Sequence, residues 1–184
     1  TLAARNGLLV RQRLSLEAAR KIDVVLFDKT GTLTKGEYGV EKIWAIQPAT
    51  TQSVLQLAAS VDSHSEHFIS RAIVAKAKGA ALSLLEVKDF LRLPGKGVRG
   101  TVAGNEILVG GFSILEGKPL SLPIETGKEI KEENRKGKTI IFVLKNQGVI
   151  GAFALADLIR EESREAIGEL KKMGVKIAMV TGDS

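Results

Sequence analysis

The chain has 184 residues, a formal net charge of +6 at pH 7 and no cysteine. Its 44% hydrophobic and 26% charged residues indicate a globular protein, and the lack of cysteine excludes a disulfide scaffold or a cysteine-ligated metal site. No apolar run approaches the roughly 20 residues that cross a bilayer, and the basic residues are scattered without stacking aromatics, so we expect a soluble fragment with no nucleic-acid partner.

Two elements are predicted near the start of the chain. Leucines and alanines among arginines predict a short basic helix within residues 8–20. Residues 22–27 form an apolar run that only Asp23 interrupts, which is typical of a strand buried on both faces of a parallel sheet. Asp28 would then stand at the carboxyl end of this strand.

The middle of the chain predicts helices and hairpins. Residues 50–61 read as a helix with Thr50 or Thr51 as N-cap, and residues 68–78 read as a second helix. Turn signals at Gly104-Asn105 and at Asn146-Gln147-Gly148 each predict a hairpin. The remaining elements are strands at 86–93 and within 98–109, a charged helix at 124–136, and strands at 139–145 and 149–155.

The end of the chain repeats the pattern of its beginning. Residues 161–173 predict a helix with acidic residues at its start and lysines at its end, which matches the helix dipole, and Gly174 suits its C-terminal cap. Residues 175–180 predict a second apolar strand that ends at Thr181-Gly182-Asp183. Because ligands bind beyond the carboxyl ends of parallel strands, we expect Asp28 and Asp183 to share a site.

These elements predict a parallel α/β domain that is interrupted by an inserted, mostly antiparallel α+β domain. We place the first part of the α/β domain at residues 1–35, the inserted domain at 36–154 and the second part at 155–184.

The residues around Asp28 have the chemistry of a phosphoryl acceptor. A carboxylate can form a phosphoaspartate, which divides one difficult transfer into two steps. The glycine in Lys29-Thr30-Gly31-Thr32 would let backbone N–H groups approach phosphate oxygens, while the hydroxyls of Thr30 and Thr32 add donors and Lys29 adds positive charge. Such a transfer needs positioning and charge stabilisation, with Mg²⁺ bridging the oxygens.

The string Asp28-Lys29-Thr30-Gly31-Thr32-Leu33-Thr34 resembles the signature of P-type ATPases. The resemblance implies a Rossmann-like phosphorylation domain of the haloacid dehalogenase type, incomplete in this chain, and an inserted nucleotide-binding domain built on an antiparallel sheet. It also implies ATP and Mg²⁺ as cofactors, with Mg²⁺ held by Asp28 and by the backbone carbonyl of Thr30. Related phosphatases carry, where this chain has Thr30, an acid that speeds hydrolysis of the phosphoenzyme. Because a threonine cannot act as that acid, the resemblance implies a long-lived phosphoenzyme.

Other segments extend this resemblance. Thr181-Gly182-Asp183 is similar to the second phosphorylation motif of the family, which implies that Thr181 contacts the phosphoryl group and Asp183 lies near the nucleotide. Asp157 and Arg160 resemble the hinge segment and are expected to contact the nucleotide. Residues 3–7 resemble the stretch after a membrane helix, so residues 1–20 would form a stalk at the cytoplasmic face of the cell membrane.

The inserted domain resembles that of the heavy-metal branch. Ser65-Glu66-His67 is similar to the nucleotide-binding motif, in which an imidazole can stack on adenine and a carboxylate can accept from its amine. Gly95, Gly97 and Gly110 resemble the glycines that complete this pocket, and the final Thr-Gly-Asp-Ser slightly favours copper or silver exporters. Phe68 replaces the usual proline, and we expect it either to pack in the core or to stack on the base.

The expected function is that of an ATP-binding, autophosphorylating part of a heavy-metal pump. The γ-phosphoryl of ATP would move to Asp28 and drive a cation through membrane helices of the parent protein that this chain lacks. The alternatives are a soluble phosphohydrolase of the haloacid dehalogenase type or a non-catalytic nucleotide-binding fragment. Because the resemblance places further catalytic segments beyond Ser184, we expect the isolated chain to bind nucleotide weakly and to hydrolyse little.

Overall fold

The structure is a computed structural model that describes residues 13–116 and 122–180. The chain divides into two compact units, one formed by residues 1–36 and 159–184 and the other by residues 37–158. Among the described residues, no helix is long and apolar enough to cross a membrane.

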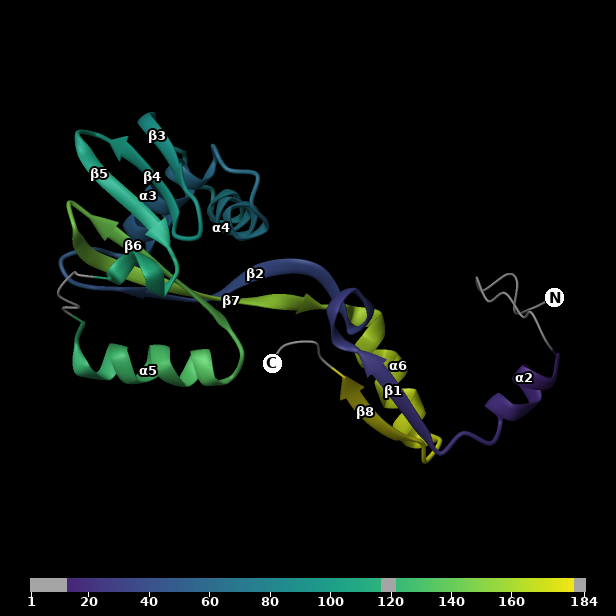
Figure 1. Cartoon of the computed structure of the whole chain (residues 1–184). Helices are drawn as coiled ribbons and strands as arrows, with labels where there is room; N and C mark the ends of the chain where they lie inside the picture. The colour runs from purple at the N-terminus through teal and green to yellow at the C-terminus, as the bar shows by residue number, and fades with distance from the viewer. Residues whose placement is uncertain (1–12, 117–121, 181–184) are drawn as a thin grey trace. The chain divides into compact units, whose positions relative to one another are not determined.

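The first unit pairs the two strands that lie far apart in the sequence. Strand β1 (Val24–Asp28) lies parallel to β8 (Lys176–Val180), with Asp28 opposite Val180. Helix α6 (Glu161–Lys172) leads into β8 and packs near it, as Figure 1 shows. The short helix α2 (Arg13–Ala19) precedes β1, and the five-residue π-helical turn η1 (Lys29–Leu33) follows it. The predicted parallel pairing of the two strands is therefore confirmed.

The prediction that the first strand is buried on both faces is wrong for the described part of the chain. Val24 and Leu26 are 49% and 67% exposed, whereas the alternate residues Val25 and Phe27 are half-buried. The described part of this sheet has only two strands, with α6 as its neighbouring helix. An apolar run predicts that both faces of a strand can be buried, but burial also depends on what packs against them.

The second unit is a six-stranded sheet in the order β2-β7-β6-β5-β4-β3, in which the neighbouring pairs from β3 to β7 are antiparallel. Its helices and strands are β2 (Thr34–Ala45), α3 (Thr51–Asp62), α4 (Phe68–Gly79), β3 (Val87–Leu93), β4 (Gly97–Val102), β5 (Asn105–Gly110), the 3₁₀ turn η2 (Phe112–Leu115), α5 (Ile124–Arg135), β6 (Thr139–Lys145) and β7 (Gly148–Ile159). The strand β2 and the turn η2 were not predicted, and β7 runs to Ile159 rather than to residue 155, whereas the predicted ranges of the other helices and strands agree closely with the structure.

Helices cover both faces of this sheet, so that its central strands are buried throughout. In β6, Ile141 and Val143 pack in the cluster that contains α3 and α4, whereas Ile140 and Phe142 pack in the cluster that contains α5 (Figure 1). Continuous apolar runs in β5, β6 and β7 therefore fit central strands that are covered on both sides. The fully buried ring of Phe153 in β7 faces the cluster of α3 and α4.

Residues close together in the sequence determine the two hairpin turns and the N-cap of α3. The β6–β7 hairpin turns through Asn146 and Gln147, whose φ angles are 47° and 71°. The β4–β5 hairpin turns through Ala103 and Gly104, at φ 47° and 75°, which is one residue earlier than the predicted Gly104-Asn105. Positive φ at both central residues is the geometry of a tight hairpin turn. The predicted N-cap is confirmed as Thr50, whose hydroxyl accepts a hydrogen bond from the backbone of Ser53 at 3.2 Å.

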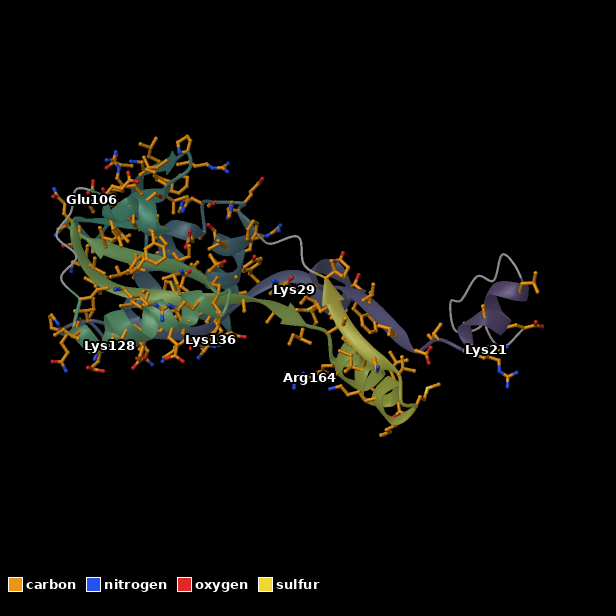
Figure 2. All side chains as sticks on the ribbon, turned by 60° about the horizontal axis from the view of Figure 1, so that its bottom comes forward. Lys21, Lys29, Glu106, Lys128, Lys136 and Arg164 are labelled. Carbon is orange, nitrogen blue, oxygen red and sulfur yellow. The ribbon has the colours of Figure 1, made fainter. Side chains whose placement is uncertain are left out.

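Glu129 joins the charged helix α5 to strand β2. Its carboxylate accepts hydrogen bonds from Lys42 Nζ at 2.5 Å and from the indole N–H of Trp44 at 2.9 Å. These hydrogen bonds hold the pKa of Glu129 below its ordinary value, and the bond from Lys42 has the largest effect. Elsewhere on α5, Lys128 and Lys136, both labelled in Figure 2, pair with glutamates of the same helix.

We expect Glu129→Gln to destabilise the second unit at pH 7 and to destabilise it less at pH 3. Because the folded pKa of Glu129 lies below its unfolded value, the stabilisation is present above the unfolded pKa and is lost as the pH falls through the folded one. Urea unfolding followed by the fluorescence of Trp44, the only tryptophan, measures this. Glu125→Gln, at an exposed position of the same helix, is the control. An equal loss at both pH values would contradict the interpretation.

Candidate functional site

The first candidate site is the turn that follows Asp28 in the first unit. Asp28 is exposed at the end of β1, and Gly31 turns the chain at φ 77°. The hydroxyl of Thr34 accepts a hydrogen bond from the backbone N–H of Gly31 at 3.2 Å and donates one to the carbonyl of Lys29 at 3.0 Å. Thr34, the last residue of the seven-residue string, thus stabilises the turn through hydrogen bonds to its backbone.

Arg160 holds the same turn from the other end of the sequence. Its backbone N–H donates to the carbonyl of Leu33 at 3.0 Å, and its Nε donates to the carbonyl of Thr34 at 3.0 Å. Its Nη2 lies 3.4 Å from the carbonyl of Gly31. Arg160, which the sequence suggested as a nucleotide residue, therefore binds the backbone of the turn after Asp28. A fixed turn keeps its groups oriented toward a ligand at the strand end.

The structure brings only some of the predicted catalytic residues together. Asp28, Lys29 and Thr32 lie in one short segment with the backbone of Thr30, whose side chain is outside the described residues. Thr181 and Asp183 are also outside the described residues, so their place beside Asp28 stays a prediction. No group of three or more metal-binding side chains occurs among the described residues. The carboxylate of Asp28 is nevertheless an oxygen ligand of the kind that Mg²⁺ prefers.

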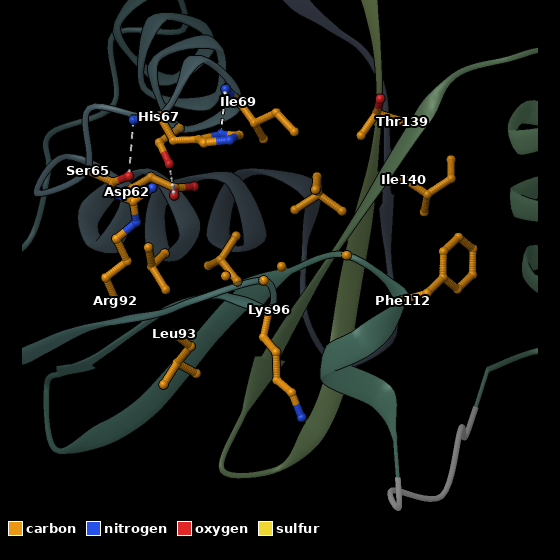
Figure 3. A pocket seen from close by; sticks show the side chains of 18 of the residues that line it. Asp62, Ser65, His67, Ile69, Arg92, Leu93, Lys96, Phe112, Thr139 and Ile140 are labelled. Atoms are coloured by element: carbon orange, nitrogen blue, oxygen red, sulfur yellow. Dashed lines mark hydrogen bonds between the residues drawn. The ribbon is translucent and has the colours of Figure 1, made fainter. Parts of the chain in front are cut away.

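The second candidate site is a cavity of about 560 Å³ in the second unit. It lies where the start of α4, the turn between β3 and β4, the end of β5 and the start of β6 meet (Figure 3). Four predicted nucleotide residues line it, namely His67, Gly95, Gly97 and Gly110. Glu66, Asp157 and Arg160 are not among its lining residues, and their assignment to the nucleotide stays a prediction.

His67 is the N-cap of α4, and this role fixes one of its ring nitrogens. Nδ1 accepts a hydrogen bond from the backbone N–H of Ile69 at 3.3 Å, and the backbone N–H of His67 donates to the hydroxyl of Ser65 at 3.3 Å (Figure 3). A neutral imidazole that accepts at Nδ1 carries its proton on Nε2. The helix cap therefore leaves Nε2 as a hydrogen-bond donor.

Asp62, at the end of α3, is a cavity residue that the sequence interpretation missed. It is only 2% exposed, and Oδ1 accepts a hydrogen bond from the hydroxyl of Ser70 at 2.6 Å, while Oδ2 has no hydrogen-bond partner in the described part of the chain. Burial raises the pKa of this carboxyl to about 7, although the Ser70 hydrogen bond opposes the rise. A signal was present, because Asp62 continues the spacing of the buried Val54 and Ala58 along α3.

The other charged groups on the cavity wall are basic. Arg92, Lys96 and Lys138 line the cavity. The ammonium group of Lys138 lies 2.6 Å from carboxylate oxygens of Glu133 and Glu41. The hydrogen bonds that it donates to them raise its pKa, and the bond to Glu133 contributes most. Arg92 and Lys96 are exposed at the surface. The wall thus combines one buried carboxyl with basic side chains, of which Lys96 also lies 3.5 Å from Glu116, and this combination suits a ligand that has both an amine and anionic groups.

Two of the four glycines in the cavity wall are required by the sheet itself. Gly97 and Gly110 face each other across β4 and β5. A Cβ atom on Gly97 would overlap the carbonyl oxygen of Val109, and one on Gly110 would overlap that of Lys96. Gly95 differs, because it has a φ of 70° with open space where a Cβ would lie. Gly95 and Gly111 are therefore the glycines that leave room beside the cavity.

Residues 22–184 match the haloacid dehalogenase-like hydrolases, and the chain belongs to this family. Within it, the chain is similar over its whole length to P-type ATPases that transport heavy metals. It is 45% identical over 184 residues to the copper-exporting P-type ATPase B of Archaeoglobus fulgidus, covering 100% of this chain and 26% of that protein. The chain thus spans about a quarter of the length of this curated relative.

Solved structures agree with this relationship. A zinc-transporting PIB-type ATPase in its E2.Pi state matches with a TM-score of 0.88 and 33% identity, covering 99% of this chain and 29% of the other. The catalytic domain of the CPx-ATPase CopB-B, studied for its conformational changes on nucleotide binding, matches with a TM-score of 0.62 and 30% identity, covering 96% and 59%. The predicted fold class and the resemblance to heavy-metal P-type ATPases are confirmed.

Proposed function

We propose that this chain is the ATP-binding and autophosphorylating region of a pump for heavy-metal cations. The observation that carries the proposal is that one chain holds two complementary sites. Asp28 is exposed at the end of a parallel strand, beside a turn that Arg160 holds. A separate cavity of about 560 Å³ lies in the second unit and has the size of a small-molecule site.

The lining of the cavity suits an adenine nucleotide. Asp62 lines the cavity, and a small movement of the wall would expose its covered Oδ2 to accept a hydrogen bond from the exocyclic amine of adenine once the carboxyl is ionised. His67 offers both an aromatic ring and a donor at Nε2. The open space beside Gly95 and the positive charges of Arg92 and Lys96 suit the phosphate chain. In this assignment Asp62 has the role that the sequence suggested for Glu66.

Asp28 would accept the γ-phosphoryl group of ATP. A carboxylate oxygen of Asp28 forms a bond to the γ-phosphorus while the bond from that phosphorus to the bridging oxygen of ADP breaks, and ADP leaves with the electron pair. Mg²⁺, held by Asp28 and by the backbone carbonyl of Thr30, would supply charge neutralisation. Lys29 adds positive charge, and the fixed turn orients the backbone around the acceptor.

Copper is the cation that sequence similarity favours. The relative from Archaeoglobus fulgidus, which is named a copper exporter, is 45% identical to this chain, whereas the zinc-transporting structure is 33% identical. Under this proposal the chain lies at the cytoplasmic face of a membrane, and its parent protein contains the helices that carry the cation. A soluble phosphohydrolase is the alternative, and rapid hydrolysis of small phosphate esters by this chain would favour it.

The test has one measurement for each site. In the full-length pump, Asp28→Asn is expected to abolish the acid-stable, hydroxylamine-sensitive phosphoprotein formed from ATP, because an amide is not a competent acceptor. Asp23→Asn, at the other end of the same segment, is the matched control. In the 184-residue chain, His67→Ala is expected to weaken ATP binding roughly 10-fold. Phosphoprotein that persists in Asp28→Asn would contradict the assignment.

A further inference from the structure

The imidazole of His67 packs against a second aromatic ring. The ring centroids of His67 and Phe68 lie 4.3 Å apart with an interplanar angle of 29°, which is a stacked arrangement. Tyr38, from strand β2, lies behind Phe68 with a centroid distance of 4.8 Å. Three rings from two elements therefore form a row that ends at a residue of the cavity wall.

Phe68 occupies neither of the places that the sequence suggested for it. It is 42% exposed, so it is not a core residue. It is also not among the residues that line the cavity, whereas the adjacent His67 is, so it is not placed to stack on a bound base. Phe68 instead covers the imidazole from outside the cavity. The ring of Phe68 packs against the rings of His67 and Tyr38.

Two independent contacts restrain the imidazole. The hydrogen bond from Ile69 N–H fixes the position of Nδ1, but the ring can still tilt about that bond. The Phe68 ring, supported by Tyr38, opposes this tilt because an offset aromatic pair has a preferred geometry. An orientation that is set before the ligand arrives does not have to be set on binding, so the free energy of ordering that side chain is not lost from the affinity.

We propose that Phe68 is a positioning residue that holds the imidazole of His67 in its nucleotide-binding orientation, with Tyr38 as its support. The proposal rests on the proposed function, because it assumes that His67 contacts the nucleotide. It also identifies why this chain has an aromatic residue at the first position of α4. The effect would act through His67 alone, since Phe68 itself does not face the cavity.

The experiment compares ATP binding by Phe68→Leu and Phe68→Tyr in the 184-residue chain. Phe68→Leu keeps an apolar side chain but removes the ring, and we expect the Kd to rise about 3- to 10-fold. Phe68→Tyr keeps the ring and should restore the parent affinity. Phe90→Leu is the matched control, because Phe90 lies beside the other histidine, His64, at 5.4 Å and does not line the cavity.

Two further readouts separate positioning from a general loss of structure. The ring-proton shifts of His67 in NMR spectra should change in Phe68→Leu while those of His64 stay the same, and Trp44 fluorescence should report an intact second unit. In a His67→Ala background, Phe68→Leu should cause no further loss of affinity. A parent-like Kd in Phe68→Leu, or an equal loss with and without His67, would overturn the proposal.

These outcomes also distinguish the inference from the proposed function. If His67→Ala weakens ATP binding but Phe68→Leu does not, only the positioning role of Phe68 fails. If the parent chain and His67→Ala bind ATP equally, the nucleotide site itself is misassigned and both proposals fail.

Discussion

Asp62→Asn is expected to weaken ATP binding roughly 10- to 100-fold and yet to stabilise the second unit at pH 8. The asparagine can still accept the hydrogen bond from Ser70, but its amide would present N–H donors or a neutral oxygen to the cavity. The proposed hydrogen bond from the adenine amine to a buried carboxylate is lost, and a hydrogen bond to a charged group contributes about 1.5–3 kcal/mol. Binding and stability should therefore change in opposite directions.

The gain in stability follows from the raised pKa of Asp62. Its ordinary value is 3.8 and its folded value is about 7. Between these values the folded chain binds the proton and the unfolded chain does not, so stability falls as the pH rises from about 4 to 7. The full loss corresponds to on the order of 4 kcal/mol and is complete above the folded pKa. Asparagine has no charge to bury and should lack this part of the pH dependence.

Urea unfolding followed by Trp44 fluorescence at pH 5 and pH 8 measures the stability difference, and calorimetric titration with ATP measures the affinity. The affinity of the parent chain for ATP should rise as the pH passes through about 7, because Asp62 then ionises. Comparison with Asp62→Asn at each pH removes the titration of the nucleotide itself. Asp89→Asn is the control, since Asp89 is exposed and its φ of 52° suits asparagine. A stability difference that does not change with pH would show that Asp62 is not buried in its neutral form.

Sequence predicted the fold well where a local signal decides the structure. Thr50 caps α3, Asn146 and Gln147 form a tight turn, and the bounds of β6 were found without error, because caps, positive φ angles and apolar runs depend on neighbouring residues. The burial of β1 was predicted wrongly, because Leu26 is buried only if another element covers it. Tertiary surroundings of this kind are not encoded in the strand itself.

The candidate sites show the same division. Asp28, Gly31 and the residues between them form one local motif and were found as a unit. Asp62, a buried residue at the end of α3 that lines the cavity, was not predicted, while the assignment of Glu66 to the nucleotide stays a prediction. The assignment of Arg160 to the nucleotide stays a prediction, and its hydrogen bond to Thr34, 126 positions earlier in the chain, was not predicted. Hydrogen bonds between residues so far apart in the sequence can be identified only from the folded structure.

Gly97→Ala is expected to destabilise the second unit by about 2–4 kcal/mol. The φ of Gly97 is 152°, which a side chain rarely adopts, and a Cβ atom there would overlap the carbonyl oxygen of Val109 in the neighbouring strand. The obstacle is backbone, so no side chain can move aside to relieve it. The strands β4 and β5 would have to separate at the Gly97–Gly110 pair, beside the cavity. Urea unfolding followed by Trp44 fluorescence measures the loss.

Comparison with two other glycines separates a structural role from a ligand role. Gly111→Ala should change stability by less than about 1 kcal/mol, because Gly111 has an ordinary φ of −72° and open space around it. Gly95→Ala should cost only the strain of its positive φ, about 1 kcal/mol, and any larger loss of ATP affinity would then report the ligand. Because Gly97→Ala disturbs the sheet, its loss of binding says little about contact with the nucleotide. Unchanged stability in Gly97→Ala would mean that β4 and β5 are less closely paired than the structure shows.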